Sequence, residues 1–161
     1  MAKQWITDRA EMEELLIDAQ AGCLATVGMD GAPYVTPLNF LYREGCIYFH
    51  CALSGRKLDN LTAEPRVCFS VFEQEGILIG GGPCDCSTRY WSVLCFGRAR
   101  LLPNGHAKAE LLAALTEKYA GQHLGLPDDQ RARQTGLVEI RVEEMTGKRN
   151  GDETIAAENQ S

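Results

Sequence analysis

The segment "YFHCALSGRKLDNL", residues 48–61, places two adjacent cations where a helix begins. Arg56 and Lys57 are unfavourable there for the helix itself, because its dipole already puts partial positive charge at this end. A bound anion would reverse that balance. Gly55 lets the backbone approach a ligand, Arg56 can grip a phosphate by two parallel hydrogen bonds, and Lys57 adds a point charge. The segment predicts a phosphate site, with a solvated basic helix turn as the alternative.

A second segment, "PYVTPLNFLY" at residues 33–42, reads as a strand that contains a proline. Pro37 has no N–H to donate to a neighbouring strand, so the segment should lie at a sheet edge or a bulge. Backbone groups beside it would then be free to bind a planar heterocycle. The alternative is an edge that another subunit covers, with no ligand.

The chain has seven cysteines, an odd number, and most of them lie in apolar, strand-like runs. They are Cys23, Cys46, Cys51, Cys68, Cys84, Cys86 and Cys95. With no secretion signal in view, we expect mainly reduced, buried thiols. Cys84 and Cys86 form a CxC pair that could hold a metal or act as a redox pair. No second pair follows at zinc-like spacing, which favours free thiols and assigns no metal site.

Composition narrows the function classes. A chain of 161 residues with 45% hydrophobic content suits one domain with a real core. The formal net charge of −6 argues against nucleic acid or an anionic membrane as the main partner, because either needs a broad basic face. No apolar run approaches the ~20 residues of a membrane span, and the N-terminus does not resemble a signal peptide. These features predict a soluble, cytoplasmic protein.

Caps, breakers and apolar spacing predict three helices, listed here in chain order: one capped by Thr7 or Asp8 and ended by Gly22, one over residues 56–63, and one capped by Asn104 and ended by Gly121. Strand-like runs account for three segments within residues 23–52 and for "RVCFSVF", "RYWSVLCFGRARLL" and "GLVEIRVEEMTG". Gly97 marks a bulge or a close approach. Residues 73–87 read mostly as a loop, in which residues 77–79 could form a brief strand.

These elements predict a mainly β fold with flanking helices, a small barrel of about six antiparallel strands. We expect a single domain over residues 1–149 and a polar, disordered tail over residues 150–161.

Three linked motifs, PYxxPLNF, YFHxAxxGxK and YxSVxxxGxA, together with a late "TGKR", resemble the FMN-binding split-barrel family of pyridoxamine 5′-phosphate oxidase-like proteins. The resemblance is closer to its nitroimidazole-resistance branch and spans residues 22–149. It implies a split barrel and a homodimer with flavin mononucleotide (FMN) at the subunit interface. The terminus "EEMTGKRNGDET" lacks the Arg- and Pro-containing end of true pyridoxamine phosphate oxidases, which argues against vitamin B6 oxidation.

The resemblance also implies roles for particular residues. Those beside the flavin ring would be Thr36, Pro37, Leu38 and Asn39, those on the ribityl side His50, Cys51 and Ala52, those at the phosphate Gly55, Arg56 and Lys57, and those on a strand that completes the pocket, within the chain or across the dimer, Tyr90, Ser92 and Val93. Lys148 and Arg149 would reach the ring or phosphate, or form a solvated pair. His50 is a candidate proton donor, with a structural hydrogen-bonding role as its alternative.

The function that this family suggests is two-electron reduction of a small molecule, a nitro compound or a quinone, with NAD(P)H as hydride source and FMN as cofactor. Two alternatives stay open. The protein could bind or store flavin without catalysis, or the same fold could bind haem or deazaflavin.

Overall fold

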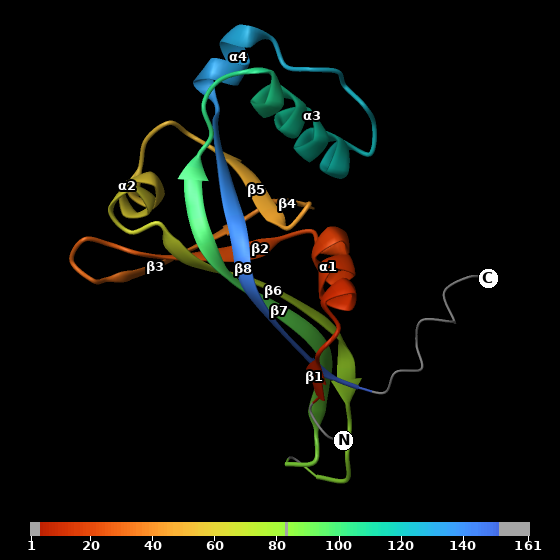
Figure 1. Ribbon diagram of the computed structural model, residues 1–161. Helices are drawn as coiled ribbons and strands as arrows, with labels where there is room; N and C mark the ends of the chain where they lie inside the picture. Colours follow the sequence, from red (N-terminus) through yellow and green to blue (C-terminus); the bar gives the residue numbers. More distant parts are fainter. Residues whose placement is uncertain (1–3, 83, 152–161) are drawn as a thin grey trace.

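The computed structural model describes residues 4–82 and 84–151 and is built around one antiparallel sheet of eight strands (Figure 1). The strands are β1 (Gln4–Ile6), β2 (Gly22–Val27), β3 (Pro33–Leu38), β4 (Leu41–Arg43), β5 (Cys46–Cys51), β6 (Arg66–Leu78), β7 (Ser87–Leu101) and β8 (Gly136–Asn150). The helices are α1 (Arg9–Asp18), α2 (Arg56–Ala63), α3 (His106–Ala120) and α4 (Asp129–Gln134).

The strand order is β3-β2-β6-β7-β8-β5-β4, with β1 paired to β8. The mainly β architecture is confirmed, but the expected number of strands was two too low. β1 was missed, and the run at residues 33–42 divides into β3 and β4. It divides because Phe40 leaves the ladder: its N–H donates to the Tyr119 hydroxyl at 2.8 Å, and its carbonyl oxygen lies 2.9 Å from the same hydroxyl. Closure of the sheet into a barrel stays a prediction.

Strand β3 ends the strand order, so Pro37 lies on an edge strand as expected. The expectation for residues 73–87 was confirmed for the connection between β6 and β7 and wrong for residues 73–78. β6 continues to Leu78 and pairs with β7 through Leu78 and Ser87, with a bulge between Gln74 and Gly76. Only residues 79–86 connect the two strands, which project as a long ribbon at the bottom of Figure 1.

Gly97 is a close-approach point, as its position in β7 predicted. The pairing of β7 with β8 shifts register between Phe96 and Gly97. A Cβ atom at Gly97 would overlap the carbonyl group of Arg141 on β8. Only glycine therefore allows the two central strands to cross this bulge at their observed separation.

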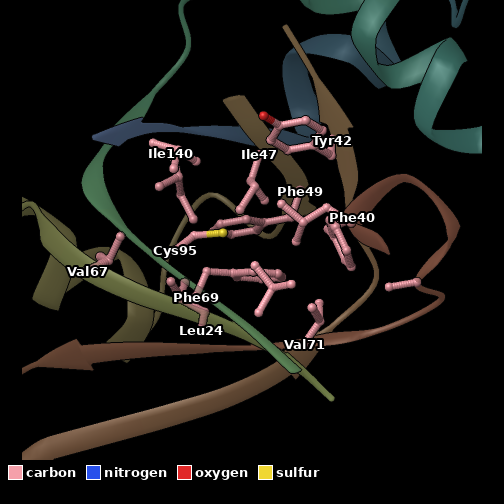
Figure 2. Close-up of a cluster of buried hydrophobic side chains, with 14 of the residues drawn as sticks. Leu24, Phe40, Tyr42, Ile47, Phe49, Val67, Phe69, Val71, Cys95 and Ile140 are labelled. Carbon is pink, nitrogen blue, oxygen red and sulfur yellow. The ribbon is translucent and has the colours of Figure 1, made fainter. Parts of the chain in front are cut away.

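The core fills the concave side of the sheet (Figure 2). Its largest fully buried side chains come from strands, from the β3–β4 connection and from α1, and include Phe40, Phe49, Phe69, Leu16, Leu24, Ile47 and Ile140. Phe40 and Phe69 meet edge to face with ring centroids 4.8 Å apart. A smaller cluster of Tyr48, Leu112 and Leu137 joins α3 to β5 and β8. The β5 side chains thus alternate between the core and α3.

The helices agree with expectation in part. α2 has the predicted bounds. α1 is capped by the Asp8 side chain, which accepts from the Ala10 N–H at 2.9 Å, but it ends at Asp18 because Gly22 already belongs to β2. Gly121 ends α3 in the left-handed conformation, as predicted.

Three further expectations were wrong. Asn104 does not cap α3, because its side-chain oxygen accepts from Lys108 Nζ at 2.8 Å and Gly105 takes the cap position. The segment between Gly121 and β8, for which no helix was expected, contains α4, capped by Asp128. Asn150 belongs to β8 rather than to a tail: it is buried, and its amide donates to Thr88 O at 2.7 Å. Residues 152–161, the rest of the expected tail, lie outside the described residues.

Candidate functional site

The start of α2 carries two cations that have no anionic partner among the described residues. Gly55 has φ 127°, a conformation that favours glycine, and no side chain caps the helix. The Arg56 guanidinium carbon lies 4.8 Å from the centroid of the Tyr34 ring, and Lys57 Nζ lies 5.0 Å from that of Phe49. Within residues 4–82 and 84–151, no carboxylate forms an ion pair with either side chain. The rings hold the cations in place and leave their charges available.

These cations line a pocket of about 190 Å³ between α2, β3 and the end of β5. The pocket brings together six of the predicted residues, Thr36, Cys51, Ala52, Gly55, Arg56 and Lys57, and adds Tyr34, Ser54 and Leu58. It is smaller than the usual pocket of a drug-sized ligand. It can therefore hold a phosphate and part of a chain, but a larger ligand must extend beyond it.

The Thr36 hydroxyl is the polar group that most clearly lacks a partner here. Thr36 Oγ1 is buried and makes no hydrogen bond within the described part of the chain. A buried hydroxyl without a partner costs free energy, roughly 1–3 kcal/mol, so a ligand that bonds to it gains affinity. A Cβ at Gly55 would meet no atom within 4 Å, so the backbone there is open to a ligand. The hydroxyl, the open backbone and the two cations together fit a flavin phosphate and its ribityl chain.

Cys51 lines the same pocket as a protonated thiol. Burial raises the pKa of Cys51, while the charges of Lys57 and Lys108 act in the opposite direction. A thiol whose pKa is raised is a poor nucleophile at neutral pH. Cys51 therefore contributes packing to this pocket rather than thiolate chemistry.

Two predicted residues lie in a separate cavity. Asn39, just after β3, and His50, on β5, line a space of about 350 Å³ beneath the C-terminal half of α3. His50 and Cys51 are neighbours in sequence, but successive side chains of a strand point to opposite sides. The two cavities are therefore separated by the end of β5.

The other predicted residues lie away from both cavities. Tyr90 and Ser92 are on β7, and Lys148 is opposite Ser92 on β8. Lys148 Nζ lies 5.5 Å from the centroid of the Trp5 ring. Val93 is fully buried and Leu38 packs against the core, so only their backbones could contact a ligand.

Tyr90, Ser92 and Lys148 share one side of the sheet with exposed apolar residues, the surface called here the outer sheet face. Its members alternate with core residues along four strands: Cys23, Val35, Pro37, Cys68, Phe72, Leu94 and Phe96. Register joins them, since Cys68 pairs with Phe96 and Cys23 pairs with Pro37. Val35 and Phe72 are 57% and 56% exposed. A contiguous apolar surface that extends over four strands is typical of a surface that binds another protein.

Burial of the cysteines was overestimated. All seven thiols are free, but only Cys95 is buried, and Cys23, Cys84 and Cys86 are exposed. Burial raises the pKa of Cys95 to about 12. Cys46 and Cys51 are half-buried against core residues. Cys23 and Cys68 lie on the outer sheet face and Cys84 and Cys86 in the β6–β7 connection, where apolar composition alone does not predict burial.

Sequence reasoning missed Tyr34 and the α3 residues. Tyr34 carried a usable signal, because it lies two residues before Thr36 on the same strand and must share its side. Leu115, Thr116 and Tyr119 carried none, because nothing in the sequence says which strand α3 covers.

The family model for pyridoxamine 5′-phosphate oxidase matches residues 8–149. The chain belongs to this family. Pyridoxamine 5′-phosphate oxidase-like proteins have a flavin-binding fold and include flavin-dependent oxidoreductases, so the resemblance seen in the sequence motifs is confirmed at the level of the family. No curated protein sequence matches this member of the family at a significant level.

Solved structures of similar fold agree with the family assignment. One similar structure is that of a protein from Bacteroides thetaiotaomicron that is provisionally described as a 5-nitroimidazole antibiotic resistance protein. It is 25% identical and has a TM-score of 0.80, and the match covers 91% of this chain and 87% of that protein. An FAD- and haem-binding protein from Mycobacterium smegmatis is 21% identical and has a TM-score of 0.82. The match covers 92% of this chain and 74% of that protein. An F420 reductase is 24% identical and has a TM-score of 0.55. The match covers 83% of this chain and 94% of the reductase. The last two likenesses concern the fold alone.

Among the helices that the structure describes, none has the length and apolar character needed to cross a membrane. Within the same residues, no three His, Cys, Asp or Glu side chains gather in a way that could hold a metal ion.

Proposed function

We propose that this chain is an FMN-dependent oxidoreductase that acts as a homodimer and reduces a small nitro compound or quinone by two electrons. The observation that carries the proposal is the pocket at the start of α2. Arg56 and Lys57 have no anionic partner there, and the Thr36 hydroxyl is buried without one. A phosphate dianion would pair both cations, and the ribityl chain of FMN would supply a partner for the hydroxyl.

A second copy of the chain would complete the site. The pocket of about 190 Å³ is too small for the whole of FMN, so the flavin ring must lie outside it. Tyr90, Ser92 and Lys148 lie on the outer sheet face of the same chain, away from that pocket. If two outer sheet faces pack together, the partner's residues of this set can approach the ring. The exposed Val35, Phe72 and neighbouring apolar residues favour such packing.

Bound FMN would supply the hydride transfer, with NAD(P)H as the electron source. The residues of this chain would hold the phosphate at Arg56 and Lys57 and the ring near Thr36 and Asn39. His50 is exposed and has no hydrogen-bond partner in the described residues, so it is free to give a proton to a reduced product.

The experiment is to purify the protein, identify any bound cofactor, and titrate the apoprotein with FMN. We expect FMN to bind with 1:1 stoichiometry per chain, and NAD(P)H oxidation to depend on an added nitroaromatic or quinone. FMN binding without turnover would instead support a flavin-binding or storage protein. No FMN binding at all would overturn the proposal.

A second candidate keeps the fold and changes the ligand. The similar fold of an FAD- and haem-binding protein and of an F420 reductase favours testing haem and deazaflavin. Arg56 and Lys57 would hold a phosphate of FAD or F420 as readily as that of FMN. The absorption spectrum of the purified protein separates these cofactors, because haem, flavin and deazaflavin absorb at different wavelengths.

A further inference from the structure

The cavity beneath α3 is formed by two parts of the chain. Asn39 and His50 contribute from the strand side, and the remaining lining residues, Leu115, Thr116, Tyr119 and Ala120, come from α3. At about 350 Å³, it is large enough for a small organic molecule. It lies beside the end of β5, one residue away from the pocket that Cys51 lines.

Most polar groups around this cavity already have partners. The Tyr119 hydroxyl contacts the backbone of Phe40 and of Gln20, and Thr116 Oγ1 donates to Leu112 O at 2.9 Å. The side chains of Asn39 and His50 are different, because neither has a hydrogen-bond partner in the part of the chain that the structure describes. An amide and a neutral imidazole can both donate to an oxygen atom of a ligand.

The cavity contains no charge. None of its six lining residues is Lys, Arg, Asp or Glu. Lys118, the cation in the same turn of α3, is directed elsewhere: its Nζ donates to Ala19 O at 2.7 Å and lies 4.5 Å from the centroid of the Phe40 ring. A charged ligand would lose solvation here and gain no opposite charge. The cavity therefore selects uncharged molecules.

We propose that this cavity binds the substrate of the reductase, an uncharged aromatic electron acceptor whose nitro or carbonyl oxygen accepts hydrogen bonds from His50 and Asn39. The inference rests on the function proposed above and adds the location of the substrate and its charge. Leu115, Thr116 and Ala120 then determine which ring fits, and the absence of a lining cation disfavours phosphorylated or carboxylated acceptors.

The test uses two nitroaromatic probes of similar size and opposite charge state, neutral 4-nitrobenzyl alcohol and anionic 4-nitrobenzoate. Calorimetry on the oxidised FMN-loaded protein should show tighter binding of the alcohol. Thr116→Lys adds one cation to the cavity wall at an exposed position. We expect it to shift the preference toward the benzoate by up to about fivefold, because a partly exposed ion pair contributes up to ~1 kcal/mol.

A matched control adds the same charge nearby. Gln122→Lys lies just beyond α3 and does not line the cavity. It should leave the preference unchanged. Ala120→Phe is a second variant that fills the cavity without adding charge, and it should weaken binding of both probes while the flavin spectrum is retained.

The possible failures are distinguishable. Absence of FMN binding by the unmodified protein would overturn the proposed function and this inference together. Normal FMN binding, with the same probe preference in Thr116→Lys as in Gln122→Lys and unchanged affinities in Ala120→Phe, would overturn this inference alone.

Discussion

At the scale of the residue, the clearest feature is a pair of cations at a helix start that neither the helix nor a carboxylate explains. Aromatic rings flank Arg56 and Lys57, and these contacts restrict the side chains without neutralising them. Most exposed cations of this chain do have an acidic neighbour, as Arg9 does in Glu13 and Arg66 does in Glu64. Arg56 and Lys57 have no ion pair in the described residues and line one pocket together, which favours a ligand that brings its own negative charge.

Replacing Arg56 or Lys57 by Ala should weaken FMN binding by roughly 30-fold or more, because a phosphate in a partly desolvated groove would lose a charge-assisted partner. Fluorescence titration of the apoprotein measures this. Riboflavin has the same ring and chain without the phosphate, so its affinity should hardly change. If the affinities for FMN and riboflavin fall equally, or if neither changes, Arg56 and Lys57 do not bind the phosphate. The alternative, a solvated basic helix turn, would then hold.

Tyr42 gives a prediction about alkaline pH. Burial, and next the nearby Glu13, raise the pKa of Tyr42 to about 12 from its usual 10. The folded state thus holds the phenol proton more tightly than the unfolded state does. This contribution to the free energy of unfolding is complete below pH 10 and is lost as the pH rises toward 12.

The variant Tyr42→Phe should therefore lose less stability between pH 10 and pH 12 than the unmodified protein. Near neutral pH it should be about as stable, because the Tyr42 hydroxyl is buried without a hydrogen-bond partner in the described residues. Urea unfolding at a series of pH values measures both effects. Parallel pH curves for the two proteins would contradict the assignment.

At the scale of the element, α3 is attached to the sheet by a few polar contacts at its C-terminal end. Tyr119 binds the backbone of Phe40, and Lys118 donates to Ala19 O. Phe40 follows Asn39 directly, so the same contacts fix one wall of the cavity beneath α3. The position of this helix thus matters for the proposed substrate cavity as well as for stability.

Replacing Tyr119 by Phe should lower the free energy of unfolding by about 1–3 kcal/mol, because the buried Phe40 N–H and carbonyl would lose their partner. Chemical denaturation measures the change. Tyr34→Phe is a matched control, since no hydrogen bond of its hydroxyl is present in the described residues. A loss no larger than that of Tyr34→Phe would show that α3 docks without this contact.

The sequence predicted correctly those helix bounds that are determined by neighbouring residues. The bounds of α2 follow from Gly55 at one end and Pro65 beyond the other, and Gly121 ends α3 through its own conformation. The prediction failed where the cause lies far away in the chain. Phe40 interrupts a strand because of Tyr119. Propensity cannot register a partner 79 residues away.

The candidate site follows the same division. Residues of one motif, Gly55, Arg56 and Lys57, lie together as predicted, because a helix start fixes them. His50 and Asn39 are separated from them, because strand alternation turns His50 away from Cys51 and Asn39 lies in the connection after β3. Tyr90 and Ser92 share no cavity with either set in the described residues, and nothing within a single sequence says whether a second copy joins them.

At the scale of the whole molecule, the outer sheet face distinguishes two oligomeric states of the protein, a monomer and a dimer. A monomer would expose Val35, Phe72 and Phe96 to water and leave Tyr90, Ser92 and Lys148 without a role at the flavin. A dimer would cover the first set and bring the second set to the partner's pocket. Stable interfaces bury about 800 Å² on each partner, an area that a four-stranded surface can supply.

Phe96→Asp should therefore convert the dimer to a monomer, because two carboxylates would be placed in an apolar interface without partners. Light scattering coupled to size exclusion measures the mass, and the affinity for FMN should fall together with it. Leu124→Asp introduces the same charge at a residue that is 63% exposed and lies outside the outer sheet face, so it should remain dimeric and bind FMN normally. If the unmodified protein is a monomer that binds FMN tightly, or if Phe96→Asp stays dimeric, the outer sheet face does not form the interface and the partner does not complete the flavin site.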